Sequence, residues 1–292
     1  MTRRELSQVG VWGSGIWLDE ARRDEAKEVA AELEDLGYGS LWASAGFRSG
    51  VPSLFGDLLA ATDRMVVATG ILSIWHSSAD QTTTGFRDLE QSYPGRFLLG
   101  LGVSHAPRVE QDGKRYERPF SRMVEYLDAL DEEEQAVPVD QRVLAALGPR
   151  MLRLCAERAA GAHPYFVPVE HASFARETLG PDALLIPEQA VVVERDPTTA
   201  REVARRHMSG YLSRPNYTDN LRRLGWGDDD LAGGASDRLV DAIVSWGTVE
   251  DIAERVQAHR DAGADSVCVQ VLSPDPAQFP RDQYRELATG LL

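Results

Sequence analysis

The sequence predicts an α/β fold in which eight parallel strands alternate with helices and close into a single (β/α)8 barrel. Short apolar runs alternate along the chain with longer segments of helical period, a pattern typical of βαβ units and a parallel sheet. The runs at 66–72 (VVATGIL) and 97–102 (FLLGLG) are apolar on both faces, as expected of strands enclosed between a barrel core and a ring of helices. The eight strands are expected at residues 9–12, 40–43, 65–72, 96–102, 142–147, 165–169, 189–193 and 266–271.

The length and composition agree with one domain of this kind. The chain has 292 residues, of which 43% are hydrophobic and 26% charged, as is ordinary for a globular protein. Barrels of this class run to about 250 residues as one domain, so we expect a single domain over residues 1–292. No stretch approaches the roughly 18 consecutive apolar residues that span a bilayer, and the polar N-terminus lacks the apolar core of a signal peptide. A cytoplasmic location is therefore expected.

The charge balance and the cysteines exclude several classes of function. The formal net charge is −15 and no basic stripe offsets it, so a nucleic-acid or acidic-membrane partner is not expected. Cys155 and Cys268 each lie in an apolar or helical run and form no cluster with metal-ligand spacing. We expect two buried thiols and no metal site.

Two helices can be located from the residues at their ends. A helix is expected over 19–36, with Gly37 at the position after its last turn. Another is expected over 248–262, which begins with the capping pattern formed by Thr248 and Asp251. Both helices feed directly into expected strands, which is the order that a βαβ unit requires.

An extended segment separates the seventh and eighth expected strands. It contains a helix over 197–212, an irregular stretch over 214–218 and an exposed loop over 226–236 that is rich in Gly and Asp. Two further helices are expected to return the chain to the barrel. The sequence shows no internal repeat and no linker that would separate a second domain.

Well-known nucleotide and hydrolase motifs are missing from the sequence. It contains no dinucleotide fingerprint, P-loop, zincin signature or nucleophile elbow. The nearest approach is Gly100-Leu101-Gly102, which lacks the third glycine and the downstream acidic residue of a Rossmann turn. The chemistry must therefore be sought at the ends of the barrel strands.

Two histidines lie where a parallel barrel carries its active site. His76 and His105 each directly follow an expected strand, and the C-terminal strand ends of such barrels build the active site. Both are candidate catalytic residues. The other four histidines are expected to be structural or exposed: His163, His171, His207 and His259.

Two backbone features suggest a ligand site at the same end of the barrel. Gly70 lies inside an apolar run, where a glycine marks a bulge, a close approach to the backbone, or a simple kink at a barrel corner. The stretch LGPRM at 147–151 lies where a strand feeds a helix, with proline at a plausible first helical position. Its free backbone amides and Arg150 would suit a phosphate, although an ordinary βα turn has the same pattern.

Aromatic residues gather at the expected strand ends. Such side chains either wall an apolar ligand pocket or fill the barrel core. We assign Phe47 and Trp75 to a substrate pocket and give no pocket role to Trp12, Trp17 or Trp42.

Five segments together carry a resemblance to a known family. They are LGYGSLWAS at 36–44, VVATGIL at 66–72, YPGRFLLGLG at 93–102, ALGPRMLRLCAERAAGAHPYFV at 146–167 and WGTVEDIAERVQAHRDAGADSVCVQVL at 246–272. In order and spacing, over most of the chain, they resemble the luciferase-like oxidoreductase superfamily, and particularly its branch that depends on the deazaflavin coenzyme F420. The resemblance implies a luciferase-like TIM barrel, a coenzyme ring at the C-terminal strand ends and a homodimer.

The resemblance also implies a set of cofactor contacts. In such proteins the third strand holds a non-prolyl cis peptide that bulges against the ring, which maps here to Gly70 and Ile71, with Ser73 contacting the cofactor. The loop over 103–105 looks like another wall, and the stretch over 147–151 matches the positions that hold the ribityl and phosphate portion. The implied cofactor-binding residues are Ala45, Gly70, Ile71, Ser73, Val103, Ser104, Leu147, Gly148, Arg150 and Met151.

The chain departs from the family pattern at its acid/base residues. The sugar-phosphate dehydrogenases of the branch place an Asp-His pair after the second strand, where this chain has Ala45-Gly46. They place a glutamate after the fourth strand, where this chain has His105. Sugar-phosphate oxidation is therefore not expected, and the substrate of those dehydrogenases cannot be assigned to this chain. His105 is the expected proton donor or acceptor, with a pKa near the working pH, and His76 is the reserve candidate.

Three functions are compatible with these residues. The first is hydride transfer between C5 of F420 and a small organic substrate such as a carbonyl, an alcohol or an activated double bond. The second is an FMN-dependent luciferase-like monooxygenase, and the third is a non-catalytic barrel that binds a cofactor or ligand. The polyanionic tail of F420 would need local arginines and backbone amides to oppose the net charge of −15.

Overall fold

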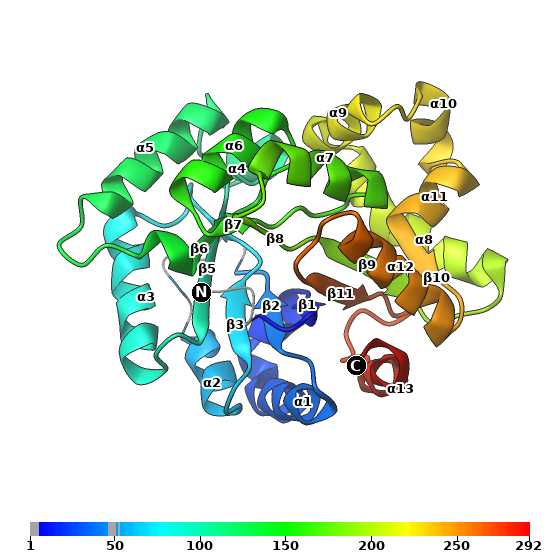
Figure 1. The fold of residues 1–292 in the computed structure, drawn as a ribbon, viewed down its shortest axis with the longest axis horizontal. Helices are drawn as coiled ribbons and strands as arrows, with labels where there is room; N and C mark the ends of the chain where they lie inside the picture. Colours follow the sequence, from blue (N-terminus) through cyan, green and yellow to red (C-terminus); the bar gives the residue numbers. More distant parts are fainter. Residues whose placement is uncertain (1–5, 46–50, 52) are drawn as a thin grey trace.

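A computed structural model describes residues 6–45, 51 and 53–292. Within these residues the strands form one parallel sheet in the order β10-β9-β11-β1-β2-β3-β5-β6-β7-β8, and β4 pairs with β5 (Figure 1). The strands are β1 (Val9–Gly13), β2 (Ser40–Ala43), β3 (Val66–Thr69), β4 (Leu72–Ser73), β5 (Phe97–Gly102), β6 (Arg142–Leu144), β7 (Gly161–Ala162), β8 (Leu184–Leu185), β9 (Glu188–Val192), β10 (Val244–Trp246) and β11 (Val267–Val271).

The sheet curls into a barrel that closes where β8 runs into β9. Strand β8 pairs with β7, whereas β9 pairs with β11, and β11 pairs with β1. At the break between β8 and β9, the backbone N–H of Ile186 donates to the carbonyl of Ala162, and the carbonyl of Pro187 accepts from the N–H of Cys268. Strands β8 and β9 therefore together take the place of one strand of the predicted (β/α)8 barrel. Strand β10 pairs with the other edge of β9.

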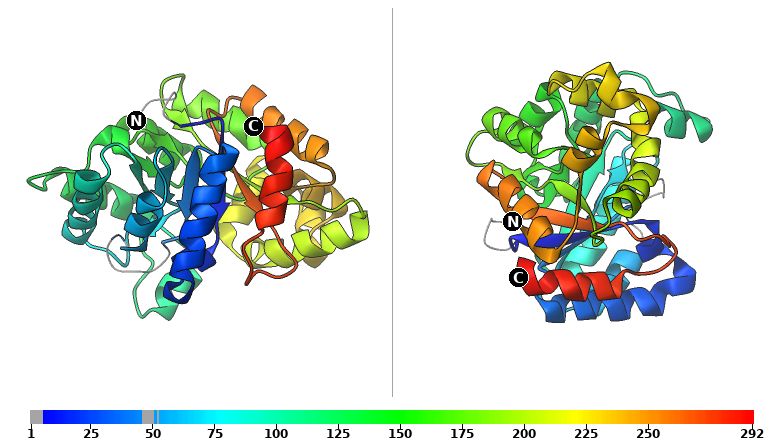
Figure 2. Two further views of the ribbon diagram at one scale, coloured as in Figure 1. Left: turned by 90° about the horizontal axis from the view of Figure 1, so that it is seen from below. Right: turned by 90° about the vertical axis from the view of Figure 1, so that its right-hand side faces the viewer.

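Helices surround the strands (Figures 1 and 2). Helix α13 at the C-terminus lies beside α1, so the last helix packs against the first, and their ion pairs join Glu32 to Arg281 and Arg285. The α-helices are α1 (Arg23–Leu36), α2 (Leu54–Ala60), α3 (Ala79–Ser92), α4 (Ala106–Gln111), α5 (Pro119–Asp131), α6 (Pro149–Arg158), α7 (Val169–Leu179), α8 (Pro197–Leu212), α9 (Pro215–Arg223), α10 (Asp228–Leu231), α11 (Asp237–Ile243), α12 (Val249–Asp261) and α13 (Arg281–Leu291).

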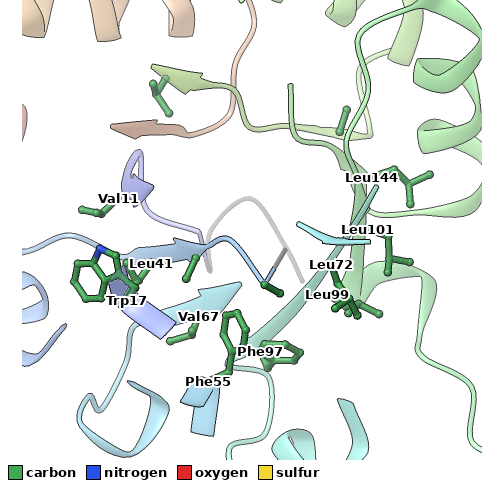
Figure 3. Packing of buried hydrophobic residues seen from close by; sticks show 14 of the residues in the cluster. Val11, Trp17, Leu41, Phe55, Val67, Leu72, Phe97, Leu99, Leu101 and Leu144 are labelled. Carbon is green, nitrogen blue, oxygen red and sulfur yellow. The ribbon is translucent and has the colours of Figure 1, made fainter. Parts of the chain in front are cut away.

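Each strand alternates between two apolar layers because successive side chains point to opposite faces. Leu41, Val67 and Phe97 face the helices, where Phe97 meets Phe55 of α2 edge-on with ring centroids 5.6 Å apart (Figure 3). Their neighbours in sequence belong to a separate cluster of buried residues in the barrel interior: Trp42, Ala68 and Leu98. The strands are thus apolar on both faces, as the sequence predicts.

Several predicted features are confirmed. Helix α8 has the predicted bounds, Thr248 forms a capping box with Asp251 at the start of α12, and Gly37 ends α1 in the left-handed conformation with φ of 107°. The first helix begins later than predicted, at Arg23, because the 3-10 turn Glu20–Arg22 precedes it. Both cysteines are buried and free. No helix among the described residues is long and apolar enough to cross a membrane.

The prediction of a strand at 165–169 is wrong. The sixth strand of the barrel is β7, four residues earlier, and the predicted stretch is a connection that enters α7. Pro164 and Pro168 have no N–H to give to a strand ladder. At Gly161, by contrast, a β carbon would lie 2.0 Å from the carbonyl oxygen of Leu184, so the close pairing of β7 and β8 needs a glycine.

The segment after α8 is also more ordered than predicted. The stretch over 214–218, predicted as irregular, begins helix α9 with Pro215 at its first position. The predicted loop over 226–236 contains α10 and the 3-10 turn Ala232–Gly234. Strand β10, between α11 and α12, was not predicted. Helices α8 to α11 group beside β9 and β10 (Figure 1), where they extend one side of the barrel.

Candidate active site

A cavity of about 450 Å³ lies at the carboxyl ends of the barrel strands. Its walls come from β1, β2, the break between β3 and β4, the segments after β5, β6 and β7, and the arm formed by α8 and α9. The lining residues are Trp12, Ser44, Gly70, Ile71, Ser73, Val103, Ser104, His105, Arg108, Tyr116, Ala145, Ala146, Leu147, Met151, His163, Tyr165, Tyr211, Arg214, Asn216 and Tyr217.

The break between β3 and β4 forms one wall. The peptide bond between Gly70 and Ile71 is cis, as the resemblance implies, and both residues line the cavity together with Ser73. A β carbon on Gly70 would lie 2.8 Å from Nε1 of Trp12, so this wall fits closely against the end of β1. Gly70 is therefore buried against Trp12 at this wall of the cavity.

His105 lies in the cavity with a pKa far from neutrality. It precedes α4, its side chain is hydrogen-bonded to Asn216, and its ring centroid lies 5.4 Å from that of Tyr217. Burial, and then the nearby Arg214 guanidinium, lower the pKa of His105 to about 4. The expected near-neutral pKa is therefore wrong, and His105 is an uncharged imidazole at pH 7.

His76 lies behind the cavity wall rather than in the lining. Its Nδ1 lies 3.0 Å from the hydroxyl of Ser73, and its Nε2 lies 3.0 Å from the carboxylate of Asp112. Burial and the charge of Lys114 lower the pKa of His76, while Asp112 opposes them. His76 therefore reaches the cavity through Ser73.

The start of helix α6 forms another part of the site. Leu147 and Met151 line the cavity, and Gly148 caps the helix, followed by proline at its first position. Arg150 is exposed and its guanidinium lies over the ring of Phe120, 4.2 Å from the centroid, so the structure places it outside the cavity. A β carbon on Gly148 would instead meet the guanidinium of Arg223 at 3.7 Å.

Two further predicted residues, Ala45 and Trp75, are not among the described lining residues. Ala45 is buried in the hydrophobic core, and its neighbour Ser44 lines the cavity in its place. Trp75 is partly buried against the hydrophobic core, and its Nε1–H donates to the carbonyl of Val103 at 2.7 Å. Phe47 lies outside the described residues.

An aromatic wall from the arm of α8 and α9 was missed by the sequence interpretation. Tyr211 and Tyr217 line the cavity together with Tyr165, which follows β7. The hydroxyl of Tyr165 donates to Oε1 of Gln270 at 2.8 Å and lies 3.0 Å from that of Tyr211, which is therefore the donor in this second bond. Burial raises the pKa of all three phenols, so they stay uncharged. Arg214 lies over Tyr211, 5.0 Å from the ring centroid.

A second cavity, also of about 450 Å³, adjoins the first. Trp12, Ser44 and Tyr211 line both cavities. The second is completed by the 3-10 turn Gly15–Leu18, by α8 and by the segment after β11, and Gln270 contributes its side chain there. The site thus has two adjoining compartments.

This parallel barrel carries its cavity at the carboxyl ends of its strands, which is where TIM barrels build their active sites. The sequence model of the luciferase-like monooxygenase family matches residues 8–142 of this chain. Over 284 residues the chain is 23% identical to 5,10-methylenetetrahydromethanopterin reductase from Archaeoglobus fulgidus, an alignment that covers 80% of this chain and 85% of that protein.

Solved structures of the same fold include enzymes with two different coenzymes. An F420-dependent secondary alcohol dehydrogenase, solved with an F420-acetone adduct, superposes with a TM-score of 0.68 at 16% identity, covering 98% of this chain and 99% of that one. The oxygenating constituent of 3,6-diketocamphane monooxygenase from Pseudomonas putida, solved with FMN, gives 0.61 at 16% identity, covering 96% and 95%. At these identities the likeness establishes the fold alone.

Proposed function

We propose that this protein is an oxidoreductase that binds coenzyme F420 and transfers a hydride between the deazaflavin and a small organic substrate. The observation that carries the proposal is the cavity at the strand ends, bounded by the Gly70–Ile71 bulge on one side and by the start of α6 on the other. The similarity to F420-dependent enzymes supports the choice of coenzyme.

The residues present fit such a group. Ile71, Val103 and Leu147 offer apolar surface to a flat ring, and the glycine at the start of α6 leaves the helix amides open to a phosphate. Arg214 lines the cavity and, within the described part of the chain, forms no ion pair with a carboxylate. Together with Arg223 it would give the polyanionic coenzyme the local positive charge that a chain of net charge −15 otherwise lacks.

When bound, the deazaflavin would supply a carbon centre that gives or takes a hydride. The neutral His105 would orient the substrate or ring by hydrogen bonding, because a group with a pKa of about 4 is almost entirely unprotonated at pH 7 and has no acidic proton to give. Ser73, backed by His76 and Asp112, is the better candidate for moving a proton between the cavity wall and the surface. The adjoining second cavity would take the substrate, with Gln270 available as a polar contact.

Titration with F420 and, separately, with FMN tests the proposal, with fluorescence polarisation as the readout. Tight binding of F420 with negligible binding of FMN supports it and justifies a screen for hydride donors and acceptors. Preference for FMN, together with oxygen consumption by the reduced flavin, would instead identify a monooxygenase like the FMN-bound structural neighbour. Binding of F420 without turnover over a broad substrate panel would favour the non-catalytic barrel. The homodimer expected from the resemblance stays a prediction, which light scattering can check.

A further inference from the structure

His163 is a buried residue at the inner side of the cavity. It follows β7, is 2% exposed and lines the cavity, while its ring stacks on Trp42 of the barrel interior with centroids 4.3 Å apart and planes 16° apart. The ring is thus held in a fixed orientation between the barrel core and the site. The sequence alone favoured a structural or exposed role for this histidine.

The hydrogen bonding of His163 fixes its tautomer. Nδ1 lies 2.7 Å from the carbonyl oxygen of Ile186, and a carbonyl can only accept, so Nδ1 carries a proton. Burial lowers the pKa of His163 to about 4, so the ring takes no second proton at pH 7. Nε2 therefore presents a lone pair and no hydrogen.

No group among the described residues donates a hydrogen bond to this lone pair. Nε2 of His163 is buried and has no hydrogen-bond partner there. Buried acceptors in folded proteins are nearly always paired, because an unpaired one has lost its hydration without compensation. His163 lines the cavity, so a molecule bound in the cavity is the candidate donor.

We infer that Nε2 of His163 accepts a hydrogen bond from the coenzyme ring, and that the site selects a ring with an N–H or O–H group at its inner edge. The inference rests on the proposed function, because it takes a ring in this cavity as its premise. His163 is then a recognition residue, which positions the ring through a directional bond while the surrounding apolar walls supply contact area.

Nitrogen NMR on protein labelled with ¹⁵N-histidine tests this directly. In the free protein Nε2 of His163 should resonate as an unprotonated nitrogen, and saturation with F420 should move it toward the position of a hydrogen-bonded one. Assignment comes from the signal that His163→Gln removes. His259 is the internal control, because it lies outside the lining and its Nε2 is paired with Gln189, so its signals should stay.

The loss of F420 affinity in one variant gives a second readout. His163→Phe should weaken F420 binding about tenfold, because the inferred hydrogen bond is lost. Phenylalanine keeps the stacking surface for Trp42 and removes the acceptor. If the variant does not fold, the NMR experiment on the wild type decides alone.

The outcomes separate the two proposals. Binding of F420, measured by polarisation, with an unmoved His163 Nε2 signal overturns the inference and leaves the proposed function in place. An Nε2 signal that is already hydrogen-bonded in the free protein and unchanged by F420 identifies a bound water as the donor and overturns it as well. If neither F420 nor FMN binds, the proposed function and the inference both fail.

Discussion

Oδ2 of Asp112 lies 3.0 Å from Nε2 of His76, whose other ring nitrogen lies 3.0 Å from the Ser73 hydroxyl. These bonds connect an exposed carboxylate to the wall of the cavity through a ring that can accept a proton at one nitrogen and release one at the other. His76 follows its strand as the sequence indicates, and the hydroxyl of Ser73 connects it to the cavity.

Asp112→Asn tests this chain of hydrogen bonds. Asp112 raises the pKa of His76 against burial and Lys114, so removing its charge should lower that pKa further. The pKa is measured by NMR titration of His76. On an identified substrate, turnover should fall by roughly tenfold or more if proton transfer along this route limits the rate. Glu110→Gln makes the same charge change at an exposed position of α4 and should leave both quantities unchanged. Equal pKa values in wild type and Asp112→Asn would rule out the coupling.

Acid should destabilise the protein between about pH 6.5 and pH 4. The unfolded chain protonates its histidines near pH 6.5, whereas the folded chain resists, so the stability present above that pH is lost as the pH falls toward the folded values. Urea unfolding at about pH 7.5 and about pH 5 measures the loss. Burial lowers the pKa to about 4, or about 3 for the last residue, in His105, His163, His171, His207 and His259.

One variant isolates a single contribution to this acid effect. His259→Gln removes the ring with the lowest pKa, so the slope of stability against pH below pH 6 should decrease by about one bound proton. The same unfolding midpoint at both pH values in the wild type would contradict the buried neutral state of these rings.

Gly100→Ala should destabilise the barrel strongly. A β carbon there would lie 1.9 Å from the carbonyl oxygen of Thr69, where β3 and β5 approach each other, so the backbone must shift at a cost of roughly 2–4 kcal/mol. Gly210→Ala is the matched control, since it lies in α8 with open space around it and should gain about 0.5–1 kcal/mol. The free energy of unfolding from chemical denaturation decides, and a loss of less than about 1 kcal/mol at Gly100 would contradict the close approach.

The fold could be predicted because its information is local. The continuous apolar runs of the strands and capped helices such as α8 and α12 each occupy one short window of sequence. Strand β7 could not be found that way, because two residues carry no periodicity and the neighbouring Tyr165–Phe166–Val167 run looks more like a strand. The glycines of Gly100-Leu101-Gly102 resemble a nucleotide turn in sequence, yet the structure uses Gly100 for close strand packing.

The site was harder to predict because part of its lining comes from a distant arm. Strand-end residues such as Ser73 and His105 follow from the barrel rule, and the structure brings them to one cavity. Tyr211 and Tyr217 reach the same cavity from helices whose sequence gives no sign of where they fold back. Arg150 shows the reverse case: its position at a helix start suggested a phosphate ligand, but its guanidinium stacks on Phe120.

Arg214→Gln probes the positive charge of the cavity in two ways. The guanidinium of Arg214 lowers the pKa of His105, so its removal should raise that pKa above about 4, although burial, the larger cause, should keep it below 6.5. NMR titration of His105 measures this shift without any ligand. The same variant should weaken F420 binding about tenfold at low salt and less at high salt, because Debye screening reduces the attraction between Arg214 and the anionic coenzyme.

Arg115→Gln supplies the control for both measurements. Its side chain is 88% exposed and lies outside the cavity lining, but the substitution changes the net charge by the same amount. If the two variants lose F420 affinity equally, the effect belongs to the overall charge of the protein and Arg214 has no local role. If Arg214→Gln alone weakens binding while the pKa of His105 rises, then Arg214 both supplies positive charge to the coenzyme site and helps to keep His105 neutral. The arm of α8 and α9 would then influence the residues at the strand ends through this one side chain.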